Sequence, residues 1–303
     1  MSVMSLTRNK ISPFKAAVGR WWANDPFTQS AAIAYYTIFS FPALIILYLG
    51  LASFFMDEAA VRDQVFGFLR ENFGRDAADT FRTIVANTAP SEESFLPFIV
   101  AGVVLIYAAL RLFLQLQKAL NYIWDINDSD VSSFRALVVR RLMSFAVMIG
   151  VLFVLAISLV ITSTISTLTE WLIQRLPDMF ALLAHAINLV LSLLIISLLF
   201  AVILKMLPDR DISWPHVAPG ALVAAALFML GEYGMGVYFG LVEPGSAYGV
   251  TGAIILLMIW VFYSSAVFLL GAEYAKTLHQ KSLVRKKGSY PSISSKKALT
   301  HSK

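Results

Sequence analysis

The stretch DPFTQSAAIAYYTIFSFPALIILYLGLASFF, residues 25–55, decides the fold. Asp25 followed by Pro26 is typical of a helix start, with the acid as N-cap and proline in the first turn. The 23 residues of 33–55 carry no charge. At 1.5 Å per residue they make a helix of about 35 Å, longer than the bilayer core of about 30 Å. The sequence therefore predicts a membrane-spanning helix.

This predicted span also carries polar side chains, which fall close to one face of the helix. Pro42 removes a backbone donor and leaves the carbonyl of Ile38 without its helical partner. Lipid cannot pair such groups, so we expect this face to turn towards protein or a wet cavity. A packed helix interface is favoured over the lining of a pathway, and both readings stay open. The polar residues are Gln29, Tyr36, Thr37 and Ser40.

Composition places the chain in a membrane. Of its 303 residues 58% are hydrophobic and only 14% are charged, where a soluble domain carries about a quarter charged residues. Residues 1–24 lack the apolar core and cleavage site of a signal peptide, so the first span is expected to direct insertion. The chain has no cysteine, which excludes disulfides and thiolate metal sites.

The whole chain is predicted to be all-α, a polytopic membrane protein with six spans. Ser12 and Pro13 start a short amphipathic helix at 12–24, which suits the membrane interface, and packing on the helix bundle stays open as the alternative. Residues 57–95 are expected to form an extracytoplasmic cap of two amphipathic helices separated by Gly74. The spans are predicted at about 33–55, 96–116, 142–163, 180–204, 217–240 and 250–271.

Further polar residues lie within these spans. Tyr107, Arg111 and Gln115 follow one helical face, and Arg111 either snorkels to the interface or serves a function. His185 and Asn188 share a face of the fourth span, where a hydrogen-bonded packing role is favoured.

The fifth span is rich in small residues and also holds one acidic residue. Gly236 and Gly240 are spaced for close approach of another helix. Glu232 is a formal charge inside the same span, where it pairs with a basic group, stays protonated or faces water.

Basic residues set the predicted orientation. If both termini are cytoplasmic, 19 of the 24 Lys and Arg residues lie on the inner side. The chain then divides into an N-terminal segment at 1–24, a membrane domain at 25–276 and a basic, disordered tail at 277–303. The expected partners are membrane lipids, with anionic headgroups at the tail and no specific nucleic acid; a homo-oligomer is left open.

No catalytic chemistry is visible in the sequence. The four histidines are scattered, and no H-E-x-x-H, P-loop, G-x-G-x-x-G or G-x-S-x-G motif occurs. Asp125, Asp128 and Asp130 are better explained as a hydrophilic turn than as a cation site. We therefore expect no enzyme, no metal and no cofactor.

Five stretches carry a resemblance to known proteins: SAAIAYYTIFSFPAL (30–44), LQKALNYIWDI (116–126), LPD with a following tryptophan (207–214), GALVAAALF (220–228) and YGVTGAIILLMIWVFYSSAVFLLGAE (248–273). They resemble, in the same order across about residues 14–280, one family of multi-pass bacterial inner-membrane proteins, the YihY / virulence factor BrkB family. The resemblance implies an inner-membrane location. An older label of that family, ribonuclease BN, finds no support in these residues, and the resemblance transfers no functional residue. Some members are suspected of moving lipids or other envelope amphiphiles.

Two functions from different classes fit this sequence. The polar faces, Pro42 and the glycine-rich fifth span favour a transporter or lipid-handling protein without its own ATPase. The alternative is an envelope scaffold in which polar side chains only hold helices together. A wet cavity reaching the middle of the membrane would indicate transport, and tight packing throughout would indicate a scaffold.

Overall fold

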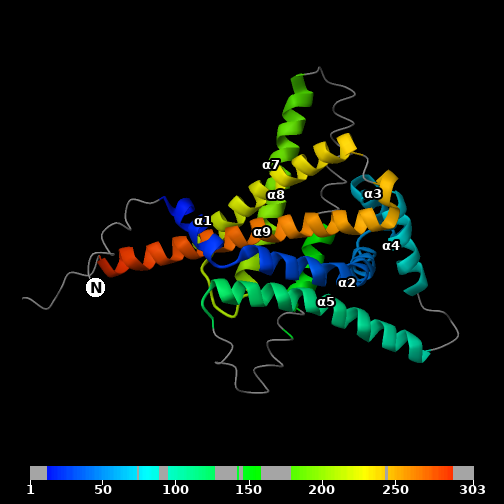
Figure 1. Cartoon of the computed structure of the whole chain (residues 1–303), viewed down its shortest axis with the longest axis horizontal. Helices are drawn as coiled ribbons and strands as arrows, with labels where there is room; N and C mark the ends of the chain where they lie inside the picture. The colour runs from blue at the N-terminus through cyan, green and yellow to red at the C-terminus, as the bar shows by residue number, and fades with distance from the viewer. Residues whose placement is uncertain are drawn as a thin grey trace, which may run out of the picture.

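Every regular element in the part of the chain that the structure describes is a helix, as the apolar blocks predict. The computed structural model describes residues 12–73, 75–88, 95–126, 142, 146–157, 179–242 and 245–288. A short apolar helix at Ala146–Ile157 lies between α5 and α7. The other helices are α1 (Pro13–Ala23), α2 (Pro26–Ala52), α3 (Glu58–Phe73), α4 (Arg75–Thr88), α5 (Phe95–Ile123), α7 (Met179–Met206), α8 (Trp214–Val242) and α9 (Gly245–Gly288) (Figure 1).

The first span, α2, starts where the sequence predicts and ends three residues early. Asp25 occupies the N-cap position, but its side chain makes no capping hydrogen bond and its backbone is left-handed, with φ of 47°. The helix continues through Pro42 and ends at Ala52 rather than Phe55. There the backbone N–H of Phe55 donates to the Ala52 carbonyl at 2.9 Å, a tight final turn that closes the helix.

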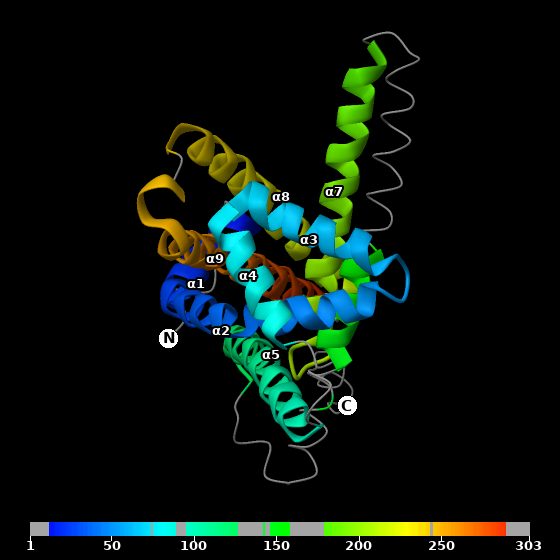
Figure 2. The ribbon, with the colours of Figure 1, turned by 90° about the vertical axis from the view of Figure 1, so that its right-hand side faces the viewer.

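The centre of the molecule is built from α2, α5 and α9, which lie side by side, with α1 packed on α9 at one end (Figures 1 and 2). Lipid tails are as apolar as leucine, so dense dispersion contacts rather than loss of water hold such helices together. The main apolar cluster joins these helices to the 146–157 helix and to the start of α8. Its fully buried members include Leu120, Trp124, Met148, Leu204, Val217 and Leu269.

The closest helix crossing is between α8 and α9. A Cβ atom on Gly220 would lie 2.5 Å from the Gly271 carbonyl oxygen, and one on Gly271 would lie 2.6 Å from the Gly220 carbonyl oxygen. Ala224 and Ala275, each four residues on, complete the contact. Close approach therefore occurs here and not at Gly236, around which a Cβ would meet nothing within 4 Å.

The predicted pair of amphipathic helices in 57–95 is confirmed as α3, which ends at Phe73, and α4, which begins at Arg75. Their apolar residues pack against α2 and α9. On α3, Phe66 is buried whereas Phe68 is 54% exposed. That this pair forms an extracytoplasmic cap stays a prediction.

Four described helical segments are long and apolar enough to cross a membrane: Pro26–Ala52, Ala186–Met206, Trp214–Val237 and Ile254–Leu283. α5 matches the predicted second span, and the predicted third span falls mostly outside the described residues. The chain is thus a membrane protein with several spanning helices. The count of six stays a prediction.

One part of α7 and one part of α8 lie apart from the central helices. Figure 2 shows α7 extending away from them, and Figure 1 shows α8 diverging from α9 towards its C-terminal end. We call residues 186–198 of α7 and 226–237 of α8 the open arm. Several large apolar side chains of the open arm are exposed, among them Leu189, Leu194, Leu198, Leu230, Tyr233 and Val237.

The predicted disordered tail begins too early. α9 continues as helix through Gly288, eleven residues past Thr277, where the tail was placed. Composition alone suggested disorder, but Thr277 and Gln280 accept hydrogen bonds from Arg20 of α1, and Thr277 is buried. These long-range contacts hold the last turns of α9 in place. Residues 289–303 of the predicted tail lie outside the described part.

Candidate functional site

The site begins at the corner between α1 and α2. Asn24 closes α1, since its backbone N–H donates to the Arg20 carbonyl at 3.0 Å. Pro26 lacks an N–H and disfavours helical geometry at the residue before it, so Asp25 turns left-handed and the chain changes direction. The Trp21 indole N–H donates to the Ala266 carbonyl of α9 at 3.0 Å and fixes this corner on the core.

Glu273 of α9 lies under this corner, with its side chain 0% exposed. Its Oε1 accepts a hydrogen bond from the Asn24 side-chain amide, and its Oε2 is 3.7 Å from the Arg20 Nε. Neither Oε2 nor that Nε has a hydrogen-bond partner among the described residues. We call the residues gathered here the Glu273 cluster: Arg20, Asn24, Asp125, Glu273, Lys276, Thr277 and Gln280.

The same cluster caps the end of α5. The Lys276 ammonium, 8% exposed, donates to the Ile123 carbonyl and lies 2.8 Å from the Asp125 Oδ2. A cation at a helix C-terminus is favoured by the helix dipole. Asp125 has the second left-handed backbone in the described part, with φ of 54°. One α9 turn thereby joins the ends of α1 and α5.

A second polar clamp holds the α7–α8 connection against α5, and we call it the Asp209 clamp. The Asn121 side-chain amide donates to the Asp209 Oδ2, and its Oδ1 accepts from the Asp209 backbone N–H at 3.0 Å. Gln117, one turn earlier and also buried, donates to the Leu207 carbonyl at 3.0 Å and to the Asp209 Oδ1 at 3.2 Å. Helix α5 therefore fixes both α9 and the α7–α8 connection.

Two histidines lie beside these clusters. The rings of His216 and His279 are 5.0 Å apart, and His279 also stands edge-on to the buried Trp124 at 5.8 Å. The Nδ1 of His216 pairs with the Ser213 Oγ at 2.6 Å. Within the described residues no three His, Asp or Glu side chains come together as metal ligands.

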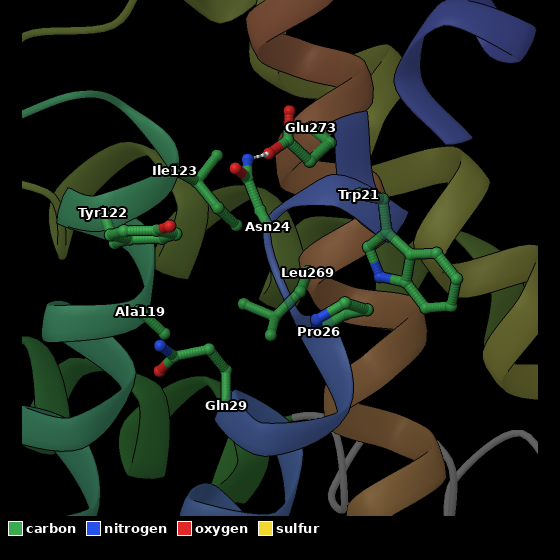
Figure 3. Close-up of a pocket in the computed structure, with 9 residues that line it drawn as sticks. All are labelled: Trp21, Asn24, Pro26, Gln29, Ala119, Tyr122, Ile123, Leu269 and Glu273. Atoms are coloured by element: carbon green, nitrogen blue, oxygen red, sulfur yellow. Dashed lines mark hydrogen bonds between the residues drawn. The ribbon is translucent and has the colours of Figure 1, made fainter. Parts of the chain in front are cut away.

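A small pocket adjoins the Glu273 cluster (Figure 3). The space open to the centre of a water molecule is about 10 Å³, which is room for one water. Figure 3 shows its lining side chains coming from α5, from α9 and from the corner between α1 and α2. They are Trp21, Asn24, Pro26, Gln29, Ala119, Tyr122, Ile123, Leu269 and Glu273.

Of the predicted polar face of α2, only Gln29 reaches this pocket. The Thr37 hydroxyl donates to the Ile33 carbonyl at 2.8 Å, and the Ser40 hydroxyl donates to the Tyr36 carbonyl at 2.7 Å. These hydroxyls are satisfied inside their own helix. The Tyr36 ring stands edge-on to the Tyr35 ring at 5.6 Å. Pro42 is half-buried in the middle of the helix.

The predicted polar ribbon of α5 does not join Gln29 in the pocket. The Arg111 guanidinium donates to the Tyr107 hydroxyl and stacks over that ring at 4.8 Å, and both residues are exposed. Gln115 is half-buried. The polar residues of α5 with buried hydrogen bonds to other helices lie on another face, at Gln117 and Asn121. A pathway along the ribbon stays a prediction.

The remaining predicted residues lie in or near the open arm. Asn188 and Glu232 are exposed on α7 and α8 respectively. The side chain of His185 lies outside the described residues. Neither Asn188 nor Glu232 has a side-chain hydrogen bond or ion pair with another described residue.

Sequence reasoning placed Glu273 and Lys276 only as boundary markers and did not single out Asn24, Gln117 or Asn121. One signal was available in the sequence. Three separate stretches that carry the family resemblance, 116–126, 207–214 and 248–273, supply the whole Asp209 clamp and, of the Glu273 cluster, Asp125 and Glu273. Polar residues inside apolar stretches that match a family are therefore candidates for bonding to one another in the fold.

Comparisons with known proteins agree with this architecture. A UPF0761 membrane protein of Vibrio parahaemolyticus is 29% identical over 273 residues, covering 88% of this chain and 82% of the relative. Those of Stenotrophomonas maltophilia and Xanthomonas oryzae are 24% and 26% identical, and the chain spans only 57% of their length. No solved structure matches. The family model described as virulence factor BrkB matches residues 17–292, and the chain therefore belongs to the BrkB family.

Proposed function

We propose that this protein handles membrane amphiphiles, binding a lipid or similar molecule along the open arm and moving it across the bilayer. The observation that carries the proposal is Glu232. Its carboxylate is exposed on α8 next to Leu230 and Tyr233, in a segment that the sequence places within the membrane. Lipid tails offer a carboxylate no partner, so an ion-pairing group must come from elsewhere.

An amphiphile with an amine headgroup supplies such a partner. Its ammonium would pair with Glu232 while its chains lie on the exposed apolar side chains of α7 and α8. Gly234 and Gly236 support this arrangement, because a Cβ on either would meet nothing within 4 Å. The α8 surface next to Glu232 is therefore shallow, and a headgroup can approach the backbone closely.

The test uses the full chain in vesicles of phosphatidylethanolamine and phosphatidylglycerol that contain a fluorescent phosphatidylethanolamine. We expect wild-type protein to speed movement of the label between leaflets and Glu232→Gln to abolish most of the gain. Glu58→Gln, which alters an exposed carboxylate paired with Arg62 on α3, is the matched control and should behave as wild type. Equal rates in protein-free and wild-type vesicles would refute the proposal.

A non-transporting envelope scaffold is the second candidate, and specific contacts favour it. The hydroxyls of Thr37 and Ser40 bond within their own helix, and the one pocket described here has room for a single water. Under this function, Glu232→Gln would leave transbilayer movement unchanged and would alter only the proteins that co-purify with the chain.

The location belongs to the same proposal. We place the protein in the bacterial inner membrane with both termini cytoplasmic, because the basic residues concentrate in the segments that this orientation puts inside. Reporter fusions at Gln64 and Ser289 are expected to report opposite compartments. The same compartment for both would contradict this orientation.

A further inference from the structure

Glu273 is a fully buried carboxylate, and one of its two oxygens accepts no hydrogen bond from the described residues. The Asn24 amide satisfies Oε1, whereas Oε2 faces the Arg20 Nε at 3.7 Å without a hydrogen bond. A buried charge with incomplete pairing costs stability, and proteins commonly keep such groups for a purpose other than stability. Glu273 is also one of the residues that line the small pocket between α5, α9 and the corner of α1 and α2.

The surrounding charges allow Glu273 to lose its own charge. The facing groups are Arg20 from α1, Asp125 from the end of α5 and Lys276 on α9 itself. Lys276 keeps Asp125 and a backbone carbonyl as partners, and the terminal nitrogens of Arg20 keep Thr277 and Gln280. Both cations therefore retain partners when Glu273 is neutral.

The pocket suits a proton better than a metal cation. Na⁺ or Ca²⁺ needs several oxygen ligands, whereas this space holds one water and lies beside two fixed cations. We propose that Glu273 is a proton-binding site, and that its protonation weakens the attachment of α1 to α9 by removing the attraction between Glu273 and Arg20, and so couples proton entry to amphiphile movement. The coupling part rests on the proposed function above; proton binding does not.

The step is a simple protonation. A proton taken up from solution forms an O–H bond at Oε2, and the carboxylate becomes a neutral acid. The attraction to Arg20 is lost, while the Asn24 bond to Oε1 persists. Movement of α9 here is passed to α8, because Gly271 is two residues from Glu273 and its carbonyl lies against Gly220 with no side chain between.

Infrared difference spectroscopy of the full chain in lipid tests proton binding directly. Between about pH 5 and pH 8 we expect a protonated-carboxyl band that Glu273→Gln abolishes and Glu58→Gln keeps. Glutamine preserves shape and the acceptor for Asn24. As a second assignment that does not depend on that variant folding, Asn24→Ala should shift the frequency of the band, because it removes the hydrogen bond to Oε1. If neither Glu273→Gln nor Asn24→Ala assigns a protonated-carboxyl band to Glu273, the proposal is overturned.

The vesicle assay tests the coupling. With an acidic interior or exterior imposed, wild-type transport of fluorescent phosphatidylethanolamine should accelerate, and Glu273→Gln, whose neutral side chain mimics the protonated acid, should transport at the same rate with and without the gradient. Transport that ignores the gradient overturns the coupling. A Glu273 band in a protein that transports nothing overturns the coupling and the proposed function and leaves proton binding supported. Transport without the band refutes proton binding alone.

Discussion

The Glu273 end of the molecule and the open arm are built from equally apolar helices but are held in different ways. At the Glu273 end, the buried Glu273 and Lys276 of α9 bond to the Asn24 side chain and to the Ile123 carbonyl of α5, and the Asp209 clamp adds the α7–α8 connection. In the open arm, the Tyr263 hydroxyl of α9 donates to the Leu227 carbonyl at 2.6 Å, and the described residues of 186–198 and 232–237 make no hydrogen bond to another helix. Buried polar contacts therefore distinguish two regions of similar apolar content.

The largest effect is expected where α8 crosses α9. Gly271→Leu forces a side chain into the Gly220 backbone, and we expect little folded protein to reach the membrane. The milder Gly271→Ala should lower the free energy of unfolding by about 1–3 kcal/mol, the usual cost of overpacking. Thermal unfolding in detergent measures this change. Gly236→Ala, on the open arm, is the control; equal losses for both alanine variants would contradict the assigned crossing.

The Asp209 clamp should rank second. Asn121→Ala removes two hydrogen bonds to Asp209, which together are expected to contribute about 1–3 kcal/mol. Asn188→Ala, an exposed asparagine of the open arm, should leave unfolding unchanged. Denaturant unfolding of the two variants side by side compares the two regions directly. A larger loss of unfolding free energy for Asn188→Ala than for Asn121→Ala would show that polar contacts also hold the open arm in place.

Ser40 offers a smaller effect. Its hydroxyl bonds only to carbonyls of α2, so Ser40→Ala should cost less than about 1 kcal/mol. In a chain without native cysteine, Ser40→Cys should also stay unreactive to water-soluble maleimide, because the side chain is buried. Rapid labelling would restore the interpretation of this face as a wet pathway.

The smallest effect is expected at Arg111. Its guanidinium contacts the Tyr107 ring and hydroxyl on an exposed part of α5, so Arg111→Leu should change the free energy of unfolding by no more than about 0.5 kcal/mol. Arg20→Leu at the Glu273 end should be clearly more destabilising. A large loss at Arg111 would mean that it has a buried partner.

Helix positions followed from the sequence because they depend on local signals. Pro26, Ser12 and the run without charge at 33–55 placed α1 and α2 within a few residues. The tail boundary at 277 was wrong, because disorder was inferred from composition while Arg20, more than 250 residues away, orders that turn.

The polar clusters could not be predicted in the same way. Helical spacing shows which side chains of one helix share a face, as with Gln117 and Asn121, but it gives no information about which helix lies opposite. The polar ribbon through Tyr107 and Arg111 was equally regular, yet it is exposed. Only the arrangement of α1, α5 and α9 in space distinguishes the two faces.

The position of Gly271 along α9 has a mechanical consequence. It stands 26 residues from Gly245 and 17 from Gly288, so the two sides of the crossing are about 39 Å and about 26 Å long. A stiff helix that pivots there acts as a lever with unequal arms. A displacement of the end beyond Glu273 then appears enlarged and in the opposite direction at the other end, on the side where α3 and α4 pack against α9.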